Sequence, residues 1–531
     1  DPLRPYDYEP DGGITLSLGD SRAKVNTRGD LVMTYAPNPG IVPSSSSTEG
    51  FSLWTARTAI DLFSAGGSVA PITSYDLESA GVNDYFLDRR YPPALGAVAG
   101  GGDVLVFGPA ALTAAPNARL DLLARNSIVY GYNPNIGGNY FTIWEDGEGG
   151  TPTSNPMRFY ALTGDIINIR VGTVQPSIED YEKKIYIGGG PVRIHAGRDI
   201  LVGGGVDDPA SEFFDDAGSG GLIMHSRDTD ISLIQAGRDI IYANFNIAGP
   251  GQLDVLAGRS IYQEDKGYFE SIGPKVAGDT RLGAGISLTA GNVGAPDYGA
   301  IRKLYLDPAN IADPDRPLAD QQGKVVKAYT KELSGWLQER YGFAGGVEEG
   351  LALFDGLAPE EQRIFLRQVY YSELREGGRE YNDSSSSRFG SYLRGRQMIA
   401  TMFPDKDAAD KAIVRTGDII MFGGSGVRTD FGGSIDMLAP DGQIVIGVQG
   451  TVPPARAGIV TQGSGDISLY SRKSILLGLS RIMTTFGGSI FGWSAEGDIN
   501  AGRGAKTTVL FTPPRRTYDD YGNVALAPQV P

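Results

Sequence analysis

A five-residue corner motif recurs along the chain and constrains the fold more than any other sequence feature. Residues 196–200 read AGRDI, residues 236–240 repeat this motif, and residues 257–261 read AGRSI. Each copy lies between two runs in which apolar and polar residues alternate, a pattern typical of strands with one buried face. A strand–corner–strand unit of this length cannot bury its apolar face alone. Stacked copies can, so the repeat predicts a β-solenoid.

The same unit returns through most of the chain as paired strand starts. The two starts of a pair lie eight or nine residues apart, and neighbouring pairs begin 22 or 23 residues apart where the loops are shortest. A coil of this length with variable loops predicts a mainly β chain folded as a right-handed parallel β-helix, whereas a propeller would need short blades of fixed length. The paired positions are Ala59 with Ser68, Arg119 with Ser127, Asp230 with Asp239, Gln252 with Ser260, Ser434 with Gln443, Asp466 with Ser474, and Ser489 with Asp498.

The glycine and the acidic residue of each corner have predicted structural roles. Glycine adopts the unusual backbone angles of a tight corner, and a short polar side chain can bond the backbone beyond it. We expect each corner aspartate to cap its corner and to pair with an arginine stacked from a neighbouring coil. Aligned catalytic carboxylates are the alternative, but catalysis needs one cluster and these residues are spread along the chain. The corner residues are Asp165, Gly197, Asp199, Gly237, Asp239, Gly258, Gly417, Asp418, Asp466 and Asp498.

Composition and charge exclude several classes of protein. Glycine makes up 75 of the 531 residues, which favours many tight turns, and the absence of cysteine excludes disulfides and thiolate sites. The net charge of −16 argues against a nucleic-acid binder, which needs a basic surface. No run of eighteen apolar residues predicts a transmembrane helix. The chain opens with DPLRPYDYEP, without an initiator methionine or signal peptide, so we expect it to be a segment of a longer protein.

The pattern changes from strand to helix in the middle of the chain. We predict a first part of the β-helix over residues 1–300, an α-helical insertion over 301–412, a second part over 413–511 and a C-terminal linker over 512–531. A second helix should begin at Pro359 and end at Gly377-Gly378, and a third is predicted over residues 392–403. Helical spacing marks the first helix through Val326, Tyr329, Leu333, Trp336 and Leu337.

The insertion also carries a dense group of aromatic and basic residues. Tyrosine and arginine are favoured at interface hot spots, so this group is a candidate binding surface. Alternatively, the same aromatics pack the insertion onto the rod. The candidate binding residues are Tyr370, Tyr371, Arg375, Arg379, Tyr381, Arg388, Tyr392 and Arg394.

Metal sites have little support in the sequence. Asp207, Asp208, Asp215 and Asp216 could hold a Ca²⁺ ion, since hard cations take several carboxylate oxygens, but they match no EF-hand loop, and a solvated acidic loop is the alternative. The two histidines, His195 and His225, both fall in predicted strands. Without cysteine or an HExxH motif, we expect no catalytic zinc site and no other cofactor.

Several stretches resemble the filamentous haemagglutinin family, very large bacterial exoproteins exported by two-partner secretion. They are the AGRDI and GDI corners, GFSLWTARTAIDLFSAGGSV at residues 50–69 and SAEGDINAGRGAKT at residues 494–507. The resemblance covers most of the chain outside the insertion and is closest to a module near the C-terminal part of such proteins. It implies a β-helix, a secreted or outer-membrane-associated location, an outer-membrane transporter as export partner, and an adhesive role in virulence. The family's NPN-type motif resembles Asn133–Ile136 here, but its mid-chain position predicts a turn, with the secretion domain lying outside this segment.

Two functions remain open at this stage. The first is a non-enzymatic rod and binding module of a surface adhesin, monomeric as a segment, that attaches to a receptor or glycan on a host or bacterial cell. Loops on a rigid scaffold are where binding usually resides. The second is a polysaccharide lyase or glycoside hydrolase that uses carboxylates on one coil face. Adjacent carboxylates in a cleft would favour the enzyme.

Overall fold

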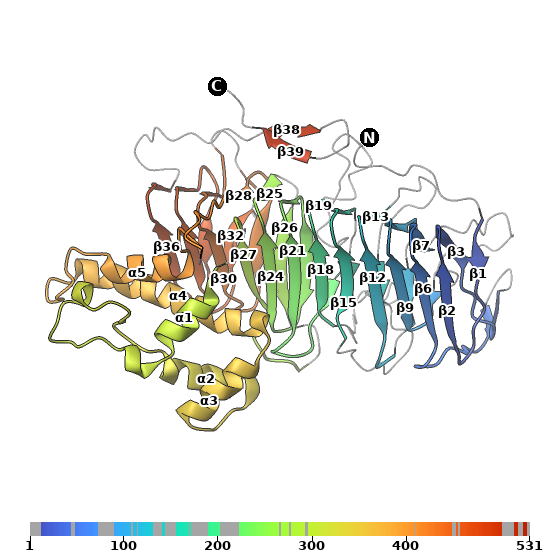
Figure 1. Cartoon of the computed structure of the whole chain (residues 1–531), viewed down its shortest axis with the longest axis horizontal. Coiled ribbons are helices and arrows are strands. Elements are labelled where there is room, and N and C mark those ends of the chain that lie inside the picture. The colour runs from blue at the N-terminus through green and yellow to red at the C-terminus, as the bar shows by residue number, and fades with distance from the viewer. Residues whose placement is uncertain are drawn as a thin grey trace.

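The described residues form long parallel sheets and one group of helices, so the predicted parallel β-helix is confirmed (Figure 1). The successive coils stack along one axis, from β1 at one end to β36 and β37 at the other. The computed structural model describes residues 12–43, 48–72, 90–107, 110–113, 115–130, 141–143, 155–168, 171–172, 190–201, 222–264, 267–274, 278–292, 296–407, 409–448, 453–454, 457–501, 515–518 and 524–527.

Sheet 1 has thirteen parallel strands, which at about 4.8 Å per strand give a rod of about 58 Å. Its strands, in spatial order, are β1 (Ile14–Thr15), β3 (Leu31–Tyr35), β7 (Val69–Ile72), β10 (Val104–Val106), β13 (Ile128–Tyr130), β16 (Ile166–Ile167), β19 (Ile200–Leu201), β22 (Ile240–Ile241), β25 (Ile261–Glu264), β28 (Ile419–Met421), β31 (Ile444–Val445), β34 (Ile475–Leu476) and β37 (Ile499–Asn500).

Sheet 2 has twelve parallel strands and carries the helical insertion on its outer face. Its strands, in spatial order, are β2 (Arg22–Thr27), β6 (Ala59–Ser64), β9 (Ala94–Ala99), β12 (Arg119–Ala124), β15 (Met157–Ala161), β18 (Val192–Ala196), β21 (Ile231–Ala236), β24 (Gln252–Ala257), β27 (Gly285–Thr289), β30 (Ile435–Ala439), β33 (Ile467–Ser471) and β36 (Ile490–Ser494).

The third side of the rod is built from two shorter parallel sheets, and two antiparallel pairs lie outside the coils. The β38–β39 pair falls within the predicted linker at residues 512–531. The four-stranded sheet contains β8 (Arg90–Tyr91), β11 (Ala110–Leu112), β14 (Phe141–Ile143) and β17 (Val171–Gly172). The six-stranded sheet contains β20 (Leu222–Met224), β23 (Asn244–Ala248), β26 (Tyr268–Gly273), β29 (Gly426–Thr429), β32 (Gly458–Thr461) and β35 (Ile482–Thr484). The antiparallel pairs are β4 (Ile41–Pro43) with β5 (Thr48–Gly50), and β38 (Arg515–Tyr518) with β39 (Val524–Ala527).

The core of the rod is a set of in-register ladders of apolar side chains. In sheet 1, Ile240, Ile261, Ile419, Ile444 and Ile475 pair in sequence on successive strands, and all are buried. Stacked copies of one β-branched side chain fill the space between sheets, and such side chains suit extended backbone. The alternating pattern of the sequence therefore predicts the inward residues correctly.

The corner glycines are required by the close approach of neighbouring coils. We expected Gly237 to adopt unusual backbone angles, but its φ lies outside the left-handed region. A Cβ at Gly237 would instead lie 2.1 Å from the carbonyl oxygen of Gly197 on the preceding coil. A Cβ at Gly258 would likewise be too close to the carbonyl oxygen of Gly237. Each of these corner glycines therefore makes room for the backbone of the coil before it.

The helical insertion leaves the rod between β27 and β28, close to the predicted boundaries. The sheets continue across it, since Ile261 of β25 pairs with Ile419 of β28. The two ends of the excursion are adjacent, because a Cβ at Gly291 would lie 3.7 Å from the carbonyl oxygen of Thr416. The helices are α1 (Tyr298–Tyr305), the 3₁₀ turns η3 (Pro308–Asn310) and η4 (Leu318–Asp320), α2 (Thr330–Tyr341), α3 (Val347–Gly356), α4 (Pro359–Asn382) and α5 (Leu393–Met402).

Helix α4 begins at Pro359 as predicted but does not end at Gly377-Gly378, and this part of the prediction is wrong. The helix runs on to Asn382, and the glycine serves the packing of α4 on α5. A Cβ at Gly377 would lie 2.8 Å from the backbone nitrogen of Gly395 in α5. The two glycines let the helix backbones approach closely, which offsets the low helix propensity of glycine.

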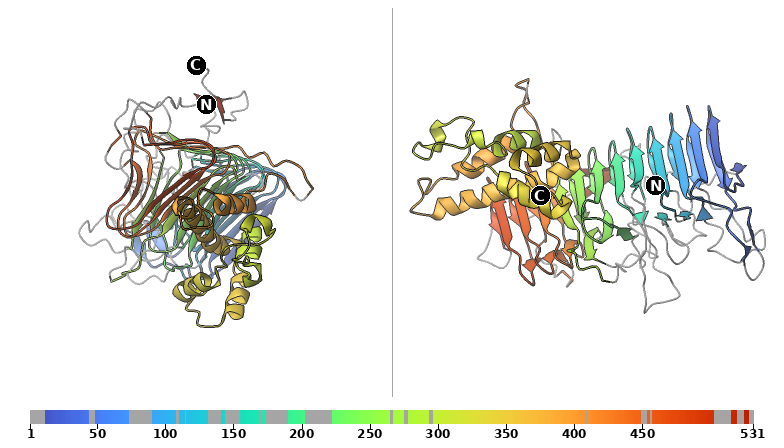
Figure 2. Two further views of the ribbon diagram at one scale, coloured as in Figure 1. Left: turned by 90° about the vertical axis from the view of Figure 1, so that its left-hand side faces the viewer. Right: turned by 90° about the horizontal axis from the view of Figure 1, so that it is seen from below.

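The insertion packs along the later coils of sheet 2 and leaves the earlier coils uncovered (Figure 2). Leu438 of β30 and Tyr470 of β33 point outward from the rod, yet both are buried in the hydrophobic core of the insertion. The insertion and the rod therefore share one apolar interface.

Candidate functional site

The corner aspartates form a structural ladder along the rod. Asp199 is buried, accepts the backbone N–H of Asp239 on the next coil at 3.0 Å, and pairs with Arg238. Asp239 likewise accepts the backbone N–H of Ser260 and pairs with Arg259. Burial raises the pKa of Asp199, and the hydrogen bond from Arg238 opposes that effect.

Other corners use the ladder without the arginine. Asp418 accepts the N–H of Gln443 at 2.9 Å, and Asp466 accepts the N–H of Ser489 at 2.6 Å. Asp498 differs, because its backbone N–H donates a hydrogen bond to the hydroxyl of Ser474. The carboxylates of Asp418 and Asp466 therefore cap the next coil and not their own corner as predicted, and the corner carboxylates are dispersed along the axis.

Three of the predicted binding residues are buried inside the insertion or beneath it. Tyr370 packs edge-on against Tyr470 of the rod, and the hydroxyl of Tyr371 donates to the carbonyl oxygen of Met437 at 2.7 Å. Arg394 donates two hydrogen bonds to the buried carboxylate of Glu373. The binding assignment is therefore corrected for Tyr370, Tyr371 and Arg394, whose side chains hold the insertion together and dock it to the rod.

The other predicted binding residues lie nearer the surface, at the end of α4 and the start of α5. Tyr381 and Tyr392 stack with ring centroids 4.1 Å apart. Arg388 pairs with Glu380, and the exposed Arg379 pairs with Glu376. Arg375 lies over the ring of Phe491 in the rod, with 5.7 Å from its guanidinium carbon to the ring centroid. Their positive charges are thus largely matched by neighbouring carboxylates or placed on aromatic rings.

A buried ion cluster joins the insertion to the rod, and sequence reasoning missed it. Arg367 of α4 lies 3.2 Å from Asp254 of β24 and 3.5 Å from Asp436 of β30, with Ser287 between the two aspartates in register. Arg363 adds a second cation 3.5 Å from Asp254. Burial raises the pKa of Asp436 to about 6 against the opposing effect of Arg367. The sequence signal for this cluster was the presence of two acidic residues, Asp254 and Asp436, at outward positions of otherwise apolar strands.

Carboxylates also align on the uncovered half of sheet 2. Asp61 and Asp121 lie two coils apart in register, with Gly96 between them. Arg119 lies 2.7 Å from Asp61, and Arg158 lies 3.1 Å from Asp121. Each carboxylate is matched by an arginine, as in a surface ion-pair network.

His195 lies in β18 as expected, whereas His225 is the first residue after β20 and not part of a strand. His225 is buried, with Nε2 2.7 Å from the hydroxyl of Ser232, and burial lowers its pKa. Burial also lowers the pKa of His195. Among the described residues, no group of three or more His, Asp or Glu side chains is arranged to hold a metal ion. Asp207, Asp208, Asp215 and Asp216, the candidate Ca²⁺ ligands, lie outside the described residues.

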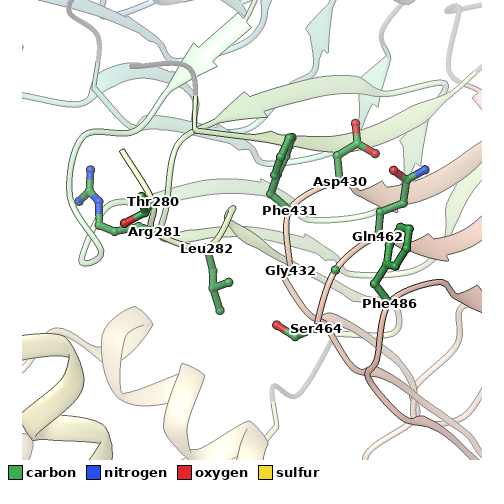
Figure 3. Close-up of a pocket in the computed structure, with 10 residues that line it drawn as sticks. Thr280, Arg281, Leu282, Asp430, Phe431, Gly432, Gln462, Ser464 and Phe486 are labelled. Carbon is green, nitrogen blue, oxygen red and sulfur yellow. The ribbon is translucent and has the colours of Figure 1, made fainter. Parts of the chain in front are cut away.

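An open groove of about 690 Å³ lies where the six-stranded sheet turns into sheet 2 (Figure 3). Phe431 and Phe486 are 55% and 79% exposed, and their rings lie on either side of Gly432. The groove crosses four successive coils. It is lined by Thr280, Arg281, Leu282, Asp430, Phe431, Gly432, Gln462, Gly463, Ser464 and Phe486.

The two rings occupy equivalent places in the repeat. Phe431 is the second residue after β29, and Phe486 is the second residue after β35. The equivalent residue after β32 is Gly463, so the coil between the two rings carries no side chain there. Two strand spacings separate the rings along the axis, about 10 Å. The absence of a side chain at Gly463 makes the hollow between them.

The charged groups in the groove are paired. Arg428 lies 2.5 Å from Asp430, and Arg281 lies 2.7 Å from Asp279 and 3.3 Å from Asp228. The groove therefore has aromatic walls and polar groups between them, and these ion pairs place three carboxylates and two arginines at it.

Comparison with known families gives one match, at the C-terminal end of the chain. The family described as "Filamentous haemagglutinin family outer membrane protein" matches residues 487–531. The resemblance noted in the sequence is thereby confirmed over these residues, which include β36, β37 and the β38–β39 pair. No curated protein and no solved structure matches the chain. In the described part of the chain, no helix has the length and apolar character needed to span a bilayer.

Proposed function

We propose that this chain is a rigid rod and binding module of a secreted or surface-exposed bacterial adhesin, exported through an outer-membrane transporter, and that it has no catalytic activity. The family match at residues 487–531 supports the bacterial surface context. The uninterrupted stack of coils supports the rod, because coils on both sides of the insertion pair with each other.

The observation that carries the binding role is the exposed aromatic groove. Phe431, Phe486 and Leu282 are each more than half exposed, and all three line it. Apolar side chains gathered at one exposed place on a folded protein mark an interaction site more often than a chance feature. The rod presents this groove on its flank.

The enzyme alternative has weaker support. The aligned pair Asp61 and Asp121 is matched by Arg119 and Arg158, and Asp254 and Asp436 lie beneath α4. A catalytic acid and base need access to a substrate, and neither pair has a described cleft beside it.

Attachment of the labelled protein to cultured epithelial cells and to bacterial cells tests the proposal. The Phe431→Ala/Phe486→Ala double variant should attach more weakly than the natural protein, and Phe389→Ala, at an exposed phenylalanine of the insertion, should attach equally well. Absence of attachment by the natural protein would contradict the proposal. Release of reducing ends or unsaturated sugars from polysaccharides would favour the enzyme instead.

A further inference from the structure

The groove beside Phe431 and Phe486 has the form of a site for an extended ligand aligned with the rod. Its lining residues come from four successive coils, so its long direction follows the stacking axis. The ring of Phe431 packs against Gly273, because a Cβ at Gly273 would lie 2.3 Å from the ring. This contact holds the ring of Phe431 in place. Two aromatic platforms about 10 Å apart, with a gap between them, suit a chain of rings more than a single compact molecule.

The backbone around the groove disfavours a peptide added as an extra strand. Strand β29 already pairs with β26 on one side and β32 on the other, and β32 pairs with β35. Strand addition needs a free sheet edge. A ligand that lies over β29 and β32 must therefore be recognised through side chains, whereas β35, which leads to Phe486, is the end strand of its sheet.

The polar groups favour an uncharged ligand rich in hydroxyl groups. Asp430 and Arg281 are each engaged with a charged neighbour, and the three carboxylates of these pairs outnumber the two arginines, so the groove disfavours a sulfated or phosphorylated chain. Gln462 and Ser464 lie on the coil between the rings and can exchange hydrogen bonds with hydroxyl groups. Aromatic walls with a few polar groups are typical of small-ligand sites.

We propose that this groove binds a neutral oligosaccharide laid along the rod axis, with sugar rings stacked on Phe431 and Phe486 and hydroxyl groups bonded by Gln462 and Ser464. The inference rests on the proposed attachment function and specifies the class of ligand.

An array of neutral, sialylated and sulfated oligosaccharides, probed with the whole chain, tests the proposal. We expect binding to neutral chains that persists at high salt, since no charge pairing drives it. In titrations with the neutral oligosaccharide that gives the strongest array signal, Phe431→Ala and Phe486→Ala should each weaken binding by about 3- to 10-fold. The control Phe389→Ala should bind like the natural protein.

Folding of the variants is checked by circular dichroism and thermal melting, and the exposure of both rings predicts little change. Gln462→Ala gives a second variant that leaves the aromatic rings intact. Binding only to acidic chains, or neutral binding that survives all three groove variants, would overturn the proposal. If cell attachment depends on Phe431 and Phe486 while no neutral oligosaccharide binds, the ligand class is wrong and the attachment function stands.

Discussion

Asp199 binds two parts of the coil that follows it: its carboxylate accepts the backbone N–H of Asp239 at 3.0 Å and pairs with the guanidinium of Arg238. The same relationship links Asp165 to Asp199 and Arg198. Because each aspartate serves the next coil, the corner motif is a device for stacking, and its repetition specifies the order of the coils.

Removal of this carboxylate should destabilise the rod. Asp199→Ala leaves the buried N–H of Asp239 and the guanidinium of Arg238 without their partner, so we expect a loss of about 2–3 kcal/mol in the free energy of unfolding. Urea denaturation followed by circular dichroism measures it. The control is Asp466→Ala, where a more exposed aspartate caps only Ser489, and its loss should be about 1 kcal/mol. Equal losses at the two corners would contradict the role given to the arginine.

Gly237 should not tolerate a side chain. A Cβ there would lie 2.1 Å from the carbonyl oxygen of Gly197, so Gly237→Ala should cost about 2–3 kcal/mol by forcing two coils apart. Gly29→Ala is the control, because no atom lies within 4 Å of its Cβ position. Thermal melting distinguishes the two variants, and an unchanged melting temperature for Gly237→Ala would show that the coils can separate at little cost.

The partly buried Asp436 should make stability depend on pH near neutrality. Its pKa is raised from 3.8 to about 6, so its contribution to stability is fully present below about pH 3.8 and is lost as the pH rises through 6. Asp436→Asn removes this dependence. We therefore expect the stability of the variant relative to the natural protein to increase by about 1.4 kcal/mol from pH 5 to pH 7.5, which is the part of the full effect that falls in this range.

Urea denaturation at the two pH values measures this difference. Asp20→Asn serves as the control, since hydrogen bonds from Thr55 and Arg57 lower the pKa of Asp20, and its effect should not change between pH 5 and pH 7.5. A constant difference between the natural protein and Asp436→Asn would show that Asp436 is ionised throughout this range.

Excision of the insertion should leave a β-rich rod that associates with itself. The ends of the excursion are adjacent at Gly291 and Thr416, so a short Gly/Ser linker can replace residues 296–415. The deletion exposes Leu438 and Tyr470, which the insertion buries. Light scattering coupled to size exclusion should show oligomers, and the further changes Leu438→Thr and Tyr470→Thr should restore a monomer. Loss of the β-sheet circular dichroism in both versions would mean that the rod needs the insertion to fold.

The solenoid could be predicted from the amino-acid sequence. Strand alternation and the AGRDI corner are local patterns that each coil repeats, so the inward positions of Ile240 and Ile261 and a structural role for Asp199 could be predicted, although the residue that Asp199 caps, Asp239, lies 40 residues later. The reason for the corner glycines was less accessible, because the clash at Gly237 involves a coil 40 residues earlier.

The contacts of the insertion and the position of the groove could not be predicted, because they join residues that are far apart in the chain. Arg367 meets Asp254 across 113 residues of sequence, and Tyr370 is buried because it faces Tyr470 of a later coil. Composition alone cannot separate an aromatic side chain packed between two surfaces from one presented to a ligand. The hollow between Phe431 and Phe486 likewise depends on stacking, which places Gly463 between rings that are 55 positions apart in the chain.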